Sequence, residues 1–192
     1  MIKALMTNWL TGLKAIGTLI VLVWCVEIVN SFFGHALNVY GIYPREAATL
    51  SGIILWAFLH SDFQHLVMNT SPLLVMGFFV AMRGVGRFVA VSLIVIVIGG
   101  IGVWCFGRSA YHIGASGLVF GYFGYLVALG IYERSIGTVA VAFLTVFYYG
   151  GIIFGVLPSD SFVSWEGHLF GLFGGIAAAR LTLDKESIDH AI

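Results

Sequence analysis

Long apolar segments constrain this chain more than any other feature of its sequence. Of its 192 residues, 60% are hydrophobic and 9% are charged, and the mean hydropathy is +1.02. A helix that crosses a lipid bilayer needs about 20 mostly apolar residues. The candidates are 13–33, 64–82, 88–106, 115–132, 136–156 and 167–183. The sequence therefore predicts an all-α membrane protein with six transmembrane helices.

The connections between these segments are short, with one exception. We expect a single domain over residues 1–183, followed by a short tail at 184–192. The exception is 34–63, a long loop between helices 1 and 2 that contains an apolar stretch at 50–59. This stretch is too short to cross the bilayer, so we expect it to lie in or dip into the outer interface. The first apolar run is too long for a signal-peptide core and is interpreted as a retained span.

Lysine and arginine side chains indicate the orientation of the helices. With a cytoplasmic N-terminus, the inner side holds Lys3, Lys14, Arg83, Arg87, Arg134, Arg180 and Lys185. The outer side then holds Arg45 and Arg108, and cytoplasmic connections are the ones enriched in basic residues. We therefore expect both termini, and the tail, to be cytoplasmic. The histidines are skewed the other way, with His35, His60, His65, His112 and His168 on the outer side. The chemistry should face outward.

The composition also excludes several function classes. Basic residues are scattered singly along the chain, so no nucleic-acid surface is expected. Cys25 and Cys105 are isolated, and the sequence contains no CxxC or Cys/His metal spacing. We therefore expect no disulfide framework, no metal and no cofactor.

Two polar residues open the fourth and sixth apolar segments. Ser116 lies in the run Gly-Ala-Ser-Gly at 114–117, and His168 lies in Gly-His-Leu-Phe-Gly at 167–171. Taken alone, a serine at a helix start is usually a cap, and a lone histidine is usually packed against a neighbouring helix. An ionisable group inside a membrane span is nevertheless costly enough to be a functional hypothesis by default. A serine and a histidine at matching ends of two parallel helices suggest a nucleophile and its base.

Residue counting places four polar groups at one depth. Measured from the first charged residue at the inner end of each segment, Ser116 and His168 stand roughly 25 and 24 Å high at about 1.5 Å per residue. His65 and Asn69, in the second segment, stand roughly 27 and 21 Å high. Residues four apart share one helical face, so these two should point the same way. Interhelical hydrogen bonding is an alternative for both. All four lie just beneath the outer surface of a hydrocarbon core about 30 Å thick.

Glycines spaced four residues apart mark the later segments. The pairs are 117 with 121, 167 with 171, and 171 with 175. Small residues at this spacing let helix backbones approach closely in membranes. We expect them to bring the fourth and sixth helices together, and Ser116 and His168 with them.

With these motifs in place, the sequence resembles the rhomboid family of intramembrane serine proteases, and within it the compact bacterial type represented by GlpG. The resemblance rests on GxSG (Gly114, Ser116, Gly117), on His168 followed by spaced glycines, and on HxxxN (His65, Asn69). Six spans, cytoplasmic termini and a long first outer loop also fit, so the resemblance covers nearly the whole chain.

The resemblance implies a serine endopeptidase that cleaves transmembrane protein substrates in the bacterial inner membrane, with a site open to the periplasm. Amide hydrolysis needs a nucleophile, a base and oxyanion donors. Ser116 would attack, and His168 would take its proton. The Ser116 backbone N–H, His65 and Asn69 would hold the oxyanion. Gly114 and Gly117 would let the backbone approach the substrate carbonyl.

Several neighbouring residues receive secondary roles. Phe120 stands where bacterial members commonly carry a tyrosine, so its ring can pack on His168 while the hydroxyl contact is lost. No acid is assigned as a third catalytic member. Glu27 is expected to make a structural hydrogen bond in the outer half of the first helix or to rest protonated, in preference to a catalytic role. Glu166 is expected to face the outer water. His60 and His112 are expected at the surface or interface, with His112 near enough to Ser116 to line a substrate entrance.

The outer side should also carry anchors and a gate. Trp56, Trp104 and Trp165 are interpreted as aromatic-belt anchors at the interface. Since water must reach a site below the membrane surface, we expect a polar cavity covered by a mobile lid at 157–163. The fifth helix is flanked by Gly150, Gly151 and Gly155 at its outer end. It could move with the lid.

Two other functions remain open. One is a catalytically silent rhomboid-like protein that binds membrane clients without cutting them; such members typically lack the serine or the histidine, and this chain has both. The other is a small channel or transporter. Against it, the chain has no ring of charges and its halves show no repeat of the kind that many transporters have.

Overall fold

The computed structural model describes residues 2–158 and 163–183, and within these ranges the chain is all-helical. The α-helices are α1 (Ile2–Phe32), α2 (Gly52–Leu55), α3 (Phe63–Ala81), α4 (Val85–Phe106), α5 (Ser116–Glu133), α6 (Ile136–Tyr149) and α7 (Trp165–Leu181). Short 3-10 helices are η1 (Ala36–Tyr40), η2 (Ala47–Thr49), η3 (Trp56–Phe58) and η4 (Gly150–Val156). The described residues form one isolated β-bridge, between Ile42 and His112, and no strand. The tail at 184–192 lies outside these ranges.

Five of the described helical segments are long and apolar enough to cross a membrane. They are Trp9–Phe32, Phe63–Ala81, Val85–Phe106, Ser116–Glu133 and Ile136–Val156, the last formed by α6 and η4 together. Each coincides closely with a segment predicted from hydropathy. The sixth predicted segment forms α7, which is shorter at 17 residues.

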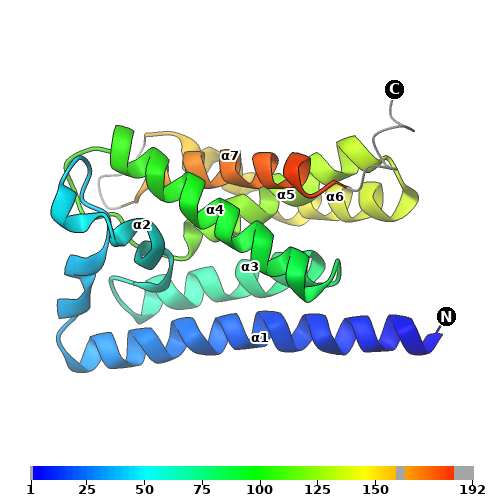
Figure 1. The fold of residues 1–192 in the computed structure, drawn as a ribbon, viewed down its shortest axis with the longest axis horizontal. Coiled ribbons are helices and arrows are strands. Elements are labelled where there is room, and N and C mark those ends of the chain that lie inside the picture. Colours follow the sequence, from blue (N-terminus) through cyan, green and yellow to red (C-terminus); the bar gives the residue numbers. More distant parts are fainter. Residues whose placement is uncertain (1, 159–162, 184–192) are drawn as a thin grey trace.

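Helix α5 lies at the centre of the bundle. It packs most extensively on α7, which in turn packs on α4, while α6 covers another side of α5 (Figure 1). A long α1 runs along one edge of the molecule and contacts α3. The start of α1 and the end of α7 point toward the same end of the bundle, and the 34–62 connection lies at the other end (Figure 1).

Glycines allow the backbones of α5 and α7 to touch. A Cβ added at Gly175 would lie 1.8 Å from the carbonyl oxygen of Gly121, and one added at Gly171 would lie 2.3 Å from that of Gly117. Neither contact could tolerate a side chain without separating the helices. The predicted approach of the fourth and sixth segments through their glycines is therefore confirmed.

The connection at 34–62 folds against the bundle as short helices. Leu50 and Ile54 are about half exposed, as expected for a segment at the interface, but Trp56 is 1% exposed. Its indole lies against Gly99 and Gly117, and its Nε1 donates a hydrogen bond to the carbonyl of Ile96 at 3.3 Å. The interpretation of Trp56 as a belt anchor is wrong, because glycines on α4 and α5 leave room for the ring in the core. Trp104 and Trp165 are partly exposed.

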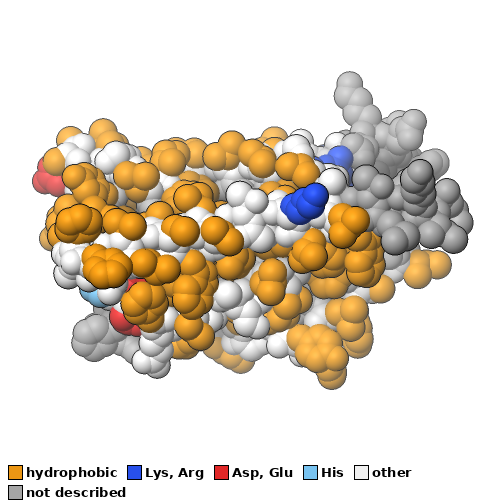
Figure 2. Space-filling model, turned by 90° about the horizontal axis from the view of Figure 1, so that it is seen from below, with side chains coloured by type: hydrophobic (Ala, Val, Ile, Leu, Met, Phe, Trp, Pro, Cys, Tyr) orange, Lys and Arg blue, Asp and Glu red, His pale blue; other side chains and the backbone are white. Residues whose placement is uncertain are grey.

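The outer surface of the bundle is apolar along most of its length. Figure 2 shows hydrophobic side chains spread over the face that carries α1, with few charged groups in view. On another side, α6 and η4 expose large aromatic side chains such as Phe143, Phe147 and Phe154. Such a surface suits lipid and would be poorly solvated in water.

Candidate active site

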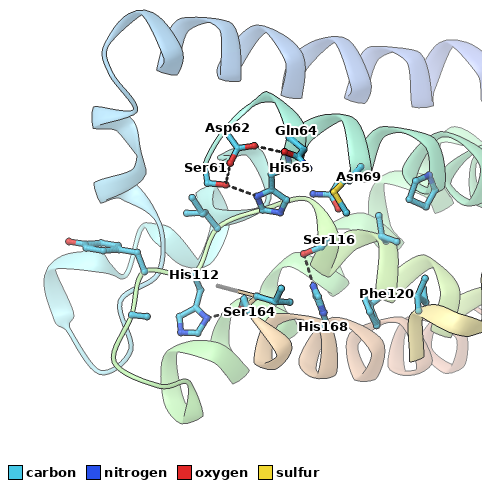
Figure 3. Close-up of a pocket in the computed structure, with 18 of the residues that line it drawn as sticks. Ser61, Asp62, Gln64, His65, Asn69, His112, Ser116, Phe120, Ser164 and His168 are labelled. Atoms are coloured by element: carbon cyan, nitrogen blue, oxygen red, sulfur yellow. Dashed lines mark hydrogen bonds between the residues drawn. The ribbon is translucent and has the colours of Figure 1, made fainter. Parts of the chain in front are cut away.

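Ser116 and His168 lie side by side at one end of the α5–α7 contact. Ser116 is the first residue of α5, and His168 lies in the first turn of α7. The hydroxyl Oγ of Ser116 lies 3.0 Å from Nε2 of His168 (Figure 3). The structure therefore brings together the two residues that the sequence analysis paired.

The ring of His168 is held by two further contacts. Its Nδ1 lies 2.8 Å from the carbonyl oxygen of Gly155 in η4. A carbonyl can only accept, so Nδ1 carries the hydrogen and Nε2 is left as an acceptor for the Ser116 hydroxyl. The Phe120 ring stacks on the imidazole, with centroids 4.1 Å apart and planes 7° from parallel. The expected stacking of Phe120 is confirmed, whereas the Gly155 carbonyl could not be foreseen because a backbone acceptor has no side-chain signature.

The chain enters α5 through a strained turn. Gly114 has φ = +124°, and a Cβ there would lie 2.7 Å from the His65 ring. Its N–H donates to the carbonyl of Trp56 at 2.9 Å, and the N–H of Ala115 donates to Nε2 of His60 at 3.3 Å. Only glycine adopts such a conformation readily. As the first residue of α5, Ser116 has a backbone N–H with no intrahelical acceptor.

His65 and Asn69 project from the outer end of α3 toward Ser116 (Figure 3). Asp62 caps this helix by accepting the N–H of His65 at 2.8 Å, and Ser61 Oγ lies 3.3 Å from Nδ1 of His65. Asn69 is 7% exposed, and its Nδ2 has no hydrogen-bond partner among the described residues. A buried amide with spare donors is available to an incoming acceptor.

A cavity of about 530 Å³ joins these groups. Its wall includes all of the paired polar residues, His65, Asn69, Ser116 and His168, together with Phe120. Residues of the outer loops also line it, including Ser61, Asp62, Arg108, Tyr111 and Ser164. A cavity is therefore present where one was predicted, with polar groups gathered in a lining that is mostly apolar. Of the predicted lid at 157–163, Val163 lines the cavity, and 159–162 lie outside the described residues.

Neither Gly114 nor Gly117 lines the cavity, and the two glycines lie in different surroundings. A Cβ at Gly117 would lie 2.1 Å from the ring of Trp56, and the Gly117 carbonyl faces Gly171. Helix packing by itself requires a small residue at Gly117, and its expected role at a substrate carbonyl stays a prediction. Gly114, in contrast, adjoins both His65 and Ser116.

Three groups expected near water are buried. Glu166 is 2% exposed, and its Oε1 accepts the N–H of Arg108 at 3.1 Å. His60 and His112 are 0% and 1% exposed. All three predictions were wrong because the outer loops fold back over the ends of the helices. His112 does line the cavity, as expected of an entrance residue.

Burial keeps both loop histidines neutral. It lowers the pKa of His60 from 6.5 to about 3, with the nearby His65 adding to the effect. Burial also lowers the pKa of His112, against the opposing influence of the Arg108 carbonyl and the Glu166 carboxylate. A neutral His60 can accept the Ala115 N–H, which a protonated ring could not do through the same atom.

Glu27 makes the structural contacts expected of it. It is fully buried in α1, where its Oε1 accepts from Nε2 of His35 at 3.0 Å. Nδ2 of Asn30 lies near its other oxygen, at 3.4 Å. Among the described residues, no group of three or more His, Cys, Asp or Glu side chains could hold a metal ion.

Comparison with known proteins identifies relatives of the chain. Residues 47–185 match the Rhomboid domain family. An uncharacterized protein of Mycobacterium tuberculosis is 37% identical over 194 residues, which cover 96% of this chain and 81% of that protein. An uncharacterized protein of Mycobacterium leprae is 38% identical over 96% of this chain and 77% of its own length. The Bacillus subtilis protein named "Putative rhomboid protease YdcA" is 32% identical over 67% of this chain and 65% of its own length.

Proposed function

The chain belongs to the rhomboid family of integral membrane proteins, and on this premise we propose that it is an intramembrane serine endopeptidase of the compact bacterial type represented by GlpG. Members of the family act on membrane-protein substrates within the bilayer. The observation that carries the proposal is the 3.0 Å contact between Ser116 Oγ and His168 Nε2, with Nδ1 of the same ring on the Gly155 carbonyl.

This geometry supports a two-residue mechanism. Ser116 Oγ attacks the carbonyl carbon of the scissile bond while its proton passes to Nε2 of His168. The imidazolium then gives that proton to the leaving amine, and water repeats the sequence to release the acyl chain from Ser116. The Gly155 carbonyl fixes the tautomer of His168 and stabilises the imidazolium, a task that a carboxylate performs in soluble serine proteases.

Donors for the tetrahedral oxyanion come from two elements. The Ser116 backbone N–H lies at the N-terminus of α5, where the helix dipole favours negative charge. The unpartnered Nδ2 of Asn69 and the ring of His65 lie across the cavity on α3. Donors of this kind stabilise the charge that develops in the transition state.

We further propose six membrane spans with both termini in the cytoplasm and the cavity open to the periplasm. With 17 residues, α7 is roughly 25 Å long at 1.5 Å per residue, so it crosses most of a hydrocarbon core about 30 Å thick. The start of α1 and the end of α7 at one end of the bundle support termini on one side (Figure 1). Substrates are membrane proteins whose spanning helix unwinds near its outer end, since an intact helix shields its amides.

Cleavage of a single-span model protein in proteoliposomes tests this function. Wild-type protein should cut the substrate near its outer membrane boundary, and Ser116→Ala should abolish the cut. Ser135→Ala is a matched control, because Ser135 caps α6 at the opposite end of the bundle and does not line the cavity. Cleavage that survives Ser116→Ala would exclude a Ser116 nucleophile. Binding of the substrate without cleavage by wild type would favour the silent client-binding alternative.

A further inference from the structure

The outer ends of α5 and α7 are joined by polar side chains that the proposed mechanism does not use. The loop at 107–115 leads into Ser116, and the segment at 163–166 leads into His168. Side chains of each segment form hydrogen bonds with the other segment. Below them, the backbones of α5 and α7 touch at Gly171 against Gly117 and at Gly175 against Gly121, where neither helix has a side chain to fix the register of the pair.

The first link is a buried carboxylate. Glu166 Oε1 accepts the backbone N–H of Arg108 at 3.1 Å and lies 3.9 Å from Nε of the same residue. The Arg108 guanidinium also donates to the carbonyl of Val163. The loop before Ser116 is thereby attached to the first turn of α7 through both its backbone and its side chain.

The second link is a serine with two tasks. Ser164 caps α7, since its Oγ accepts the N–H of Gly167 at 3.2 Å and its carbonyl accepts the N–H of His168 at 3.1 Å. The same Oγ lies 2.6 Å from Nδ1 of His112 (Figure 3). One hydroxyl therefore sets the start of the helix that carries His168 and binds the loop that carries Ser116.

The loop is fixed on its far side as well. His112 and Ile42 exchange backbone hydrogen bonds of 3.1 and 2.8 Å, which ties 107–115 to the outer connection. Nε2 of His112 lies 3.1 Å from the carbonyl of Arg108. Ser164 therefore binds to a loop that is already held, and a shift of α7 would have to break these contacts.

We propose that Ser164, Glu166, Arg108 and His112 form an outer clasp that positions His168 against Ser116 and that holds only while His112 is neutral. The inference rests on the proposed protease function. The clasp residues are positioning residues and do not contact the substrate carbonyl. A misplacement of about 1 Å between reacting groups can cost about 100-fold in rate, so a small relaxation of the clasp is enough to matter.

The hydrogen-bond pattern explains why the charge on His112 matters. Nε2 faces a carbonyl and must carry a hydrogen, so Nδ1 accepts from the Ser164 hydroxyl. A second proton on Nδ1 would leave the Ser164 hydrogen without this acceptor. The charged groups around the ring are Glu166 on α7, Arg108 in its own loop, and Arg45, which donates to the Gly107 carbonyl from the outer connection.

The first test compares two capping serines. In detergent micelles, the rate of Ser116 labelling by a fluorophosphonate should fall about 10- to 100-fold in Ser164→Ala. Ser164→Thr keeps the hydroxyl and should restore most of the rate. Ser135→Ala is the matched control, because Ser135 caps α6 with an equal distance of 3.2 Å but lies away from the cavity. An unchanged labelling rate in Ser164→Ala would overturn the clasp.

The second test uses the pH profile and does not depend on the folding of Ser164→Ala. In wild type, both His112 and His168 must be neutral, so the logarithm of the labelling rate should rise on the acid side with a slope of about two. His112→Asn keeps an acceptor near the position of Nδ1 and removes the titrating group, so its slope should fall to about one. An identical acid limb in both proteins would contradict the requirement for neutral His112.

These outcomes distinguish failure of the clasp from failure of the proposed protease function. If wild type neither labels at Ser116 nor cleaves a substrate, the proposed protease function fails. If wild type does both while Ser164→Ala and His112→Asn behave like it at every pH, the clasp alone fails. Reduced thermal stability of Ser164→Ala with unchanged labelling would assign Ser164 a purely structural role.

Discussion

The two neighbours of α5 differ sharply in how they pack. Toward α7 the backbones touch at two glycine pairs, and 72% of the residues in α5 are buried. The helix on the other side, α6, is mostly exposed: of its described residues, two are buried, Thr138 and Thr145. The described residues of η4 include no buried one. Yet η4 supplies the Gly155 carbonyl that holds His168.

The difference separates two tasks of the site. The tight α5–α7 pair holds Ser116 Oγ and His168 Nε2, the proposed nucleophile and base, 3.0 Å apart. The loose α6–η4 side contacts the ring of His168 through one backbone atom, the Gly155 carbonyl oxygen. Movement of η4 would release Nδ1 of His168 while leaving the α5–α7 contact intact.

The largest expected effect comes from adding a methyl group to the tight side. Gly175→Ala would place a Cβ 1.8 Å from the Gly121 carbonyl oxygen, so the helices must separate. We expect a cost at or above the upper end of the about 1–3 kcal/mol typical of overpacking, with loss of cleavage. Thermal unfolding in micelles measures the loss of stability, and the cleavage assay measures the loss of activity.

The matched variant lies on the loose side. A Cβ at Gly137 in α6 meets no atom of the described residues within 4 Å. Gly137→Ala should leave cleavage unchanged and raise stability by up to about 1 kcal/mol. Equal losses of stability and cleavage in Gly175→Ala and Gly137→Ala would refute the contrast between the α7 side and the α6 side of α5.

Removal of the Asn69 amide should slow catalysis without disturbing the fold. Asn69→Ala deletes a buried donor that has no partner among the described residues. Loss of one oxyanion donor costs about 10²–10³ in kcat, with little change expected in KM. The adjacent Thr70→Ala is the control, since Thr70 Oγ1 bonds to the Leu66 carbonyl and to Trp24, away from the cavity. A comparable loss in both variants would argue against a role for Asn69 at the oxyanion.

Hydrogen exchange should show the contrast directly. Amides of Gly150–Val156 should exchange about tenfold or more faster than those of α5, because elements with few buried contacts open at low free energy. Mass spectrometry of the protein in nanodiscs, after a short pulse of deuterium, compares the two segments. Equal protection would mean that η4 is as firmly held as α5.

A smaller effect is expected from pH. The folded-state pKa of His60, about 3, lies below the value of 6.5 for an exposed histidine, so the unfolded chain binds more protons between these values. Stability should therefore be complete above pH 6.5 and fall as the pH drops through that window. Melting curves in micelles should show a lower Tm at pH 5 than at pH 7. His60→Gln, which keeps an acceptor for the Ala115 N–H, should flatten this dependence.

Helix positions and the level of the polar residues could be predicted from the sequence. Both follow from local periodicity: hydropathy marks the spans, and helical rise puts Ser116 and His168 at one depth. The i,i+4 spacing likewise placed His65 and Asn69 on one face of α3. These predictions need no knowledge of how the helices surround one another.

The wrong predictions share a physical cause. Trp56, Glu166 and His112 were assigned to water or to the interface because they lie at its level along the membrane normal. Depth does not say whether a residue faces outward or into the bundle. The outer loops fold over the helix ends, and only the tertiary arrangement reveals that glycines on α4 and α5 accommodate the Trp56 ring.

The central claim is that His168 activates Ser116 for attack, and mass spectrometry of a fluorophosphonate adduct tests it most directly. Wild-type protein should carry one adduct, on Ser116, which Ser116→Ala removes and His168→Asn slows by orders of magnitude. His35→Asn is the control, because His35 pairs with Glu27 away from the cavity. An adduct on another residue, or equal labelling rates in wild type and His168→Asn, would contradict the account.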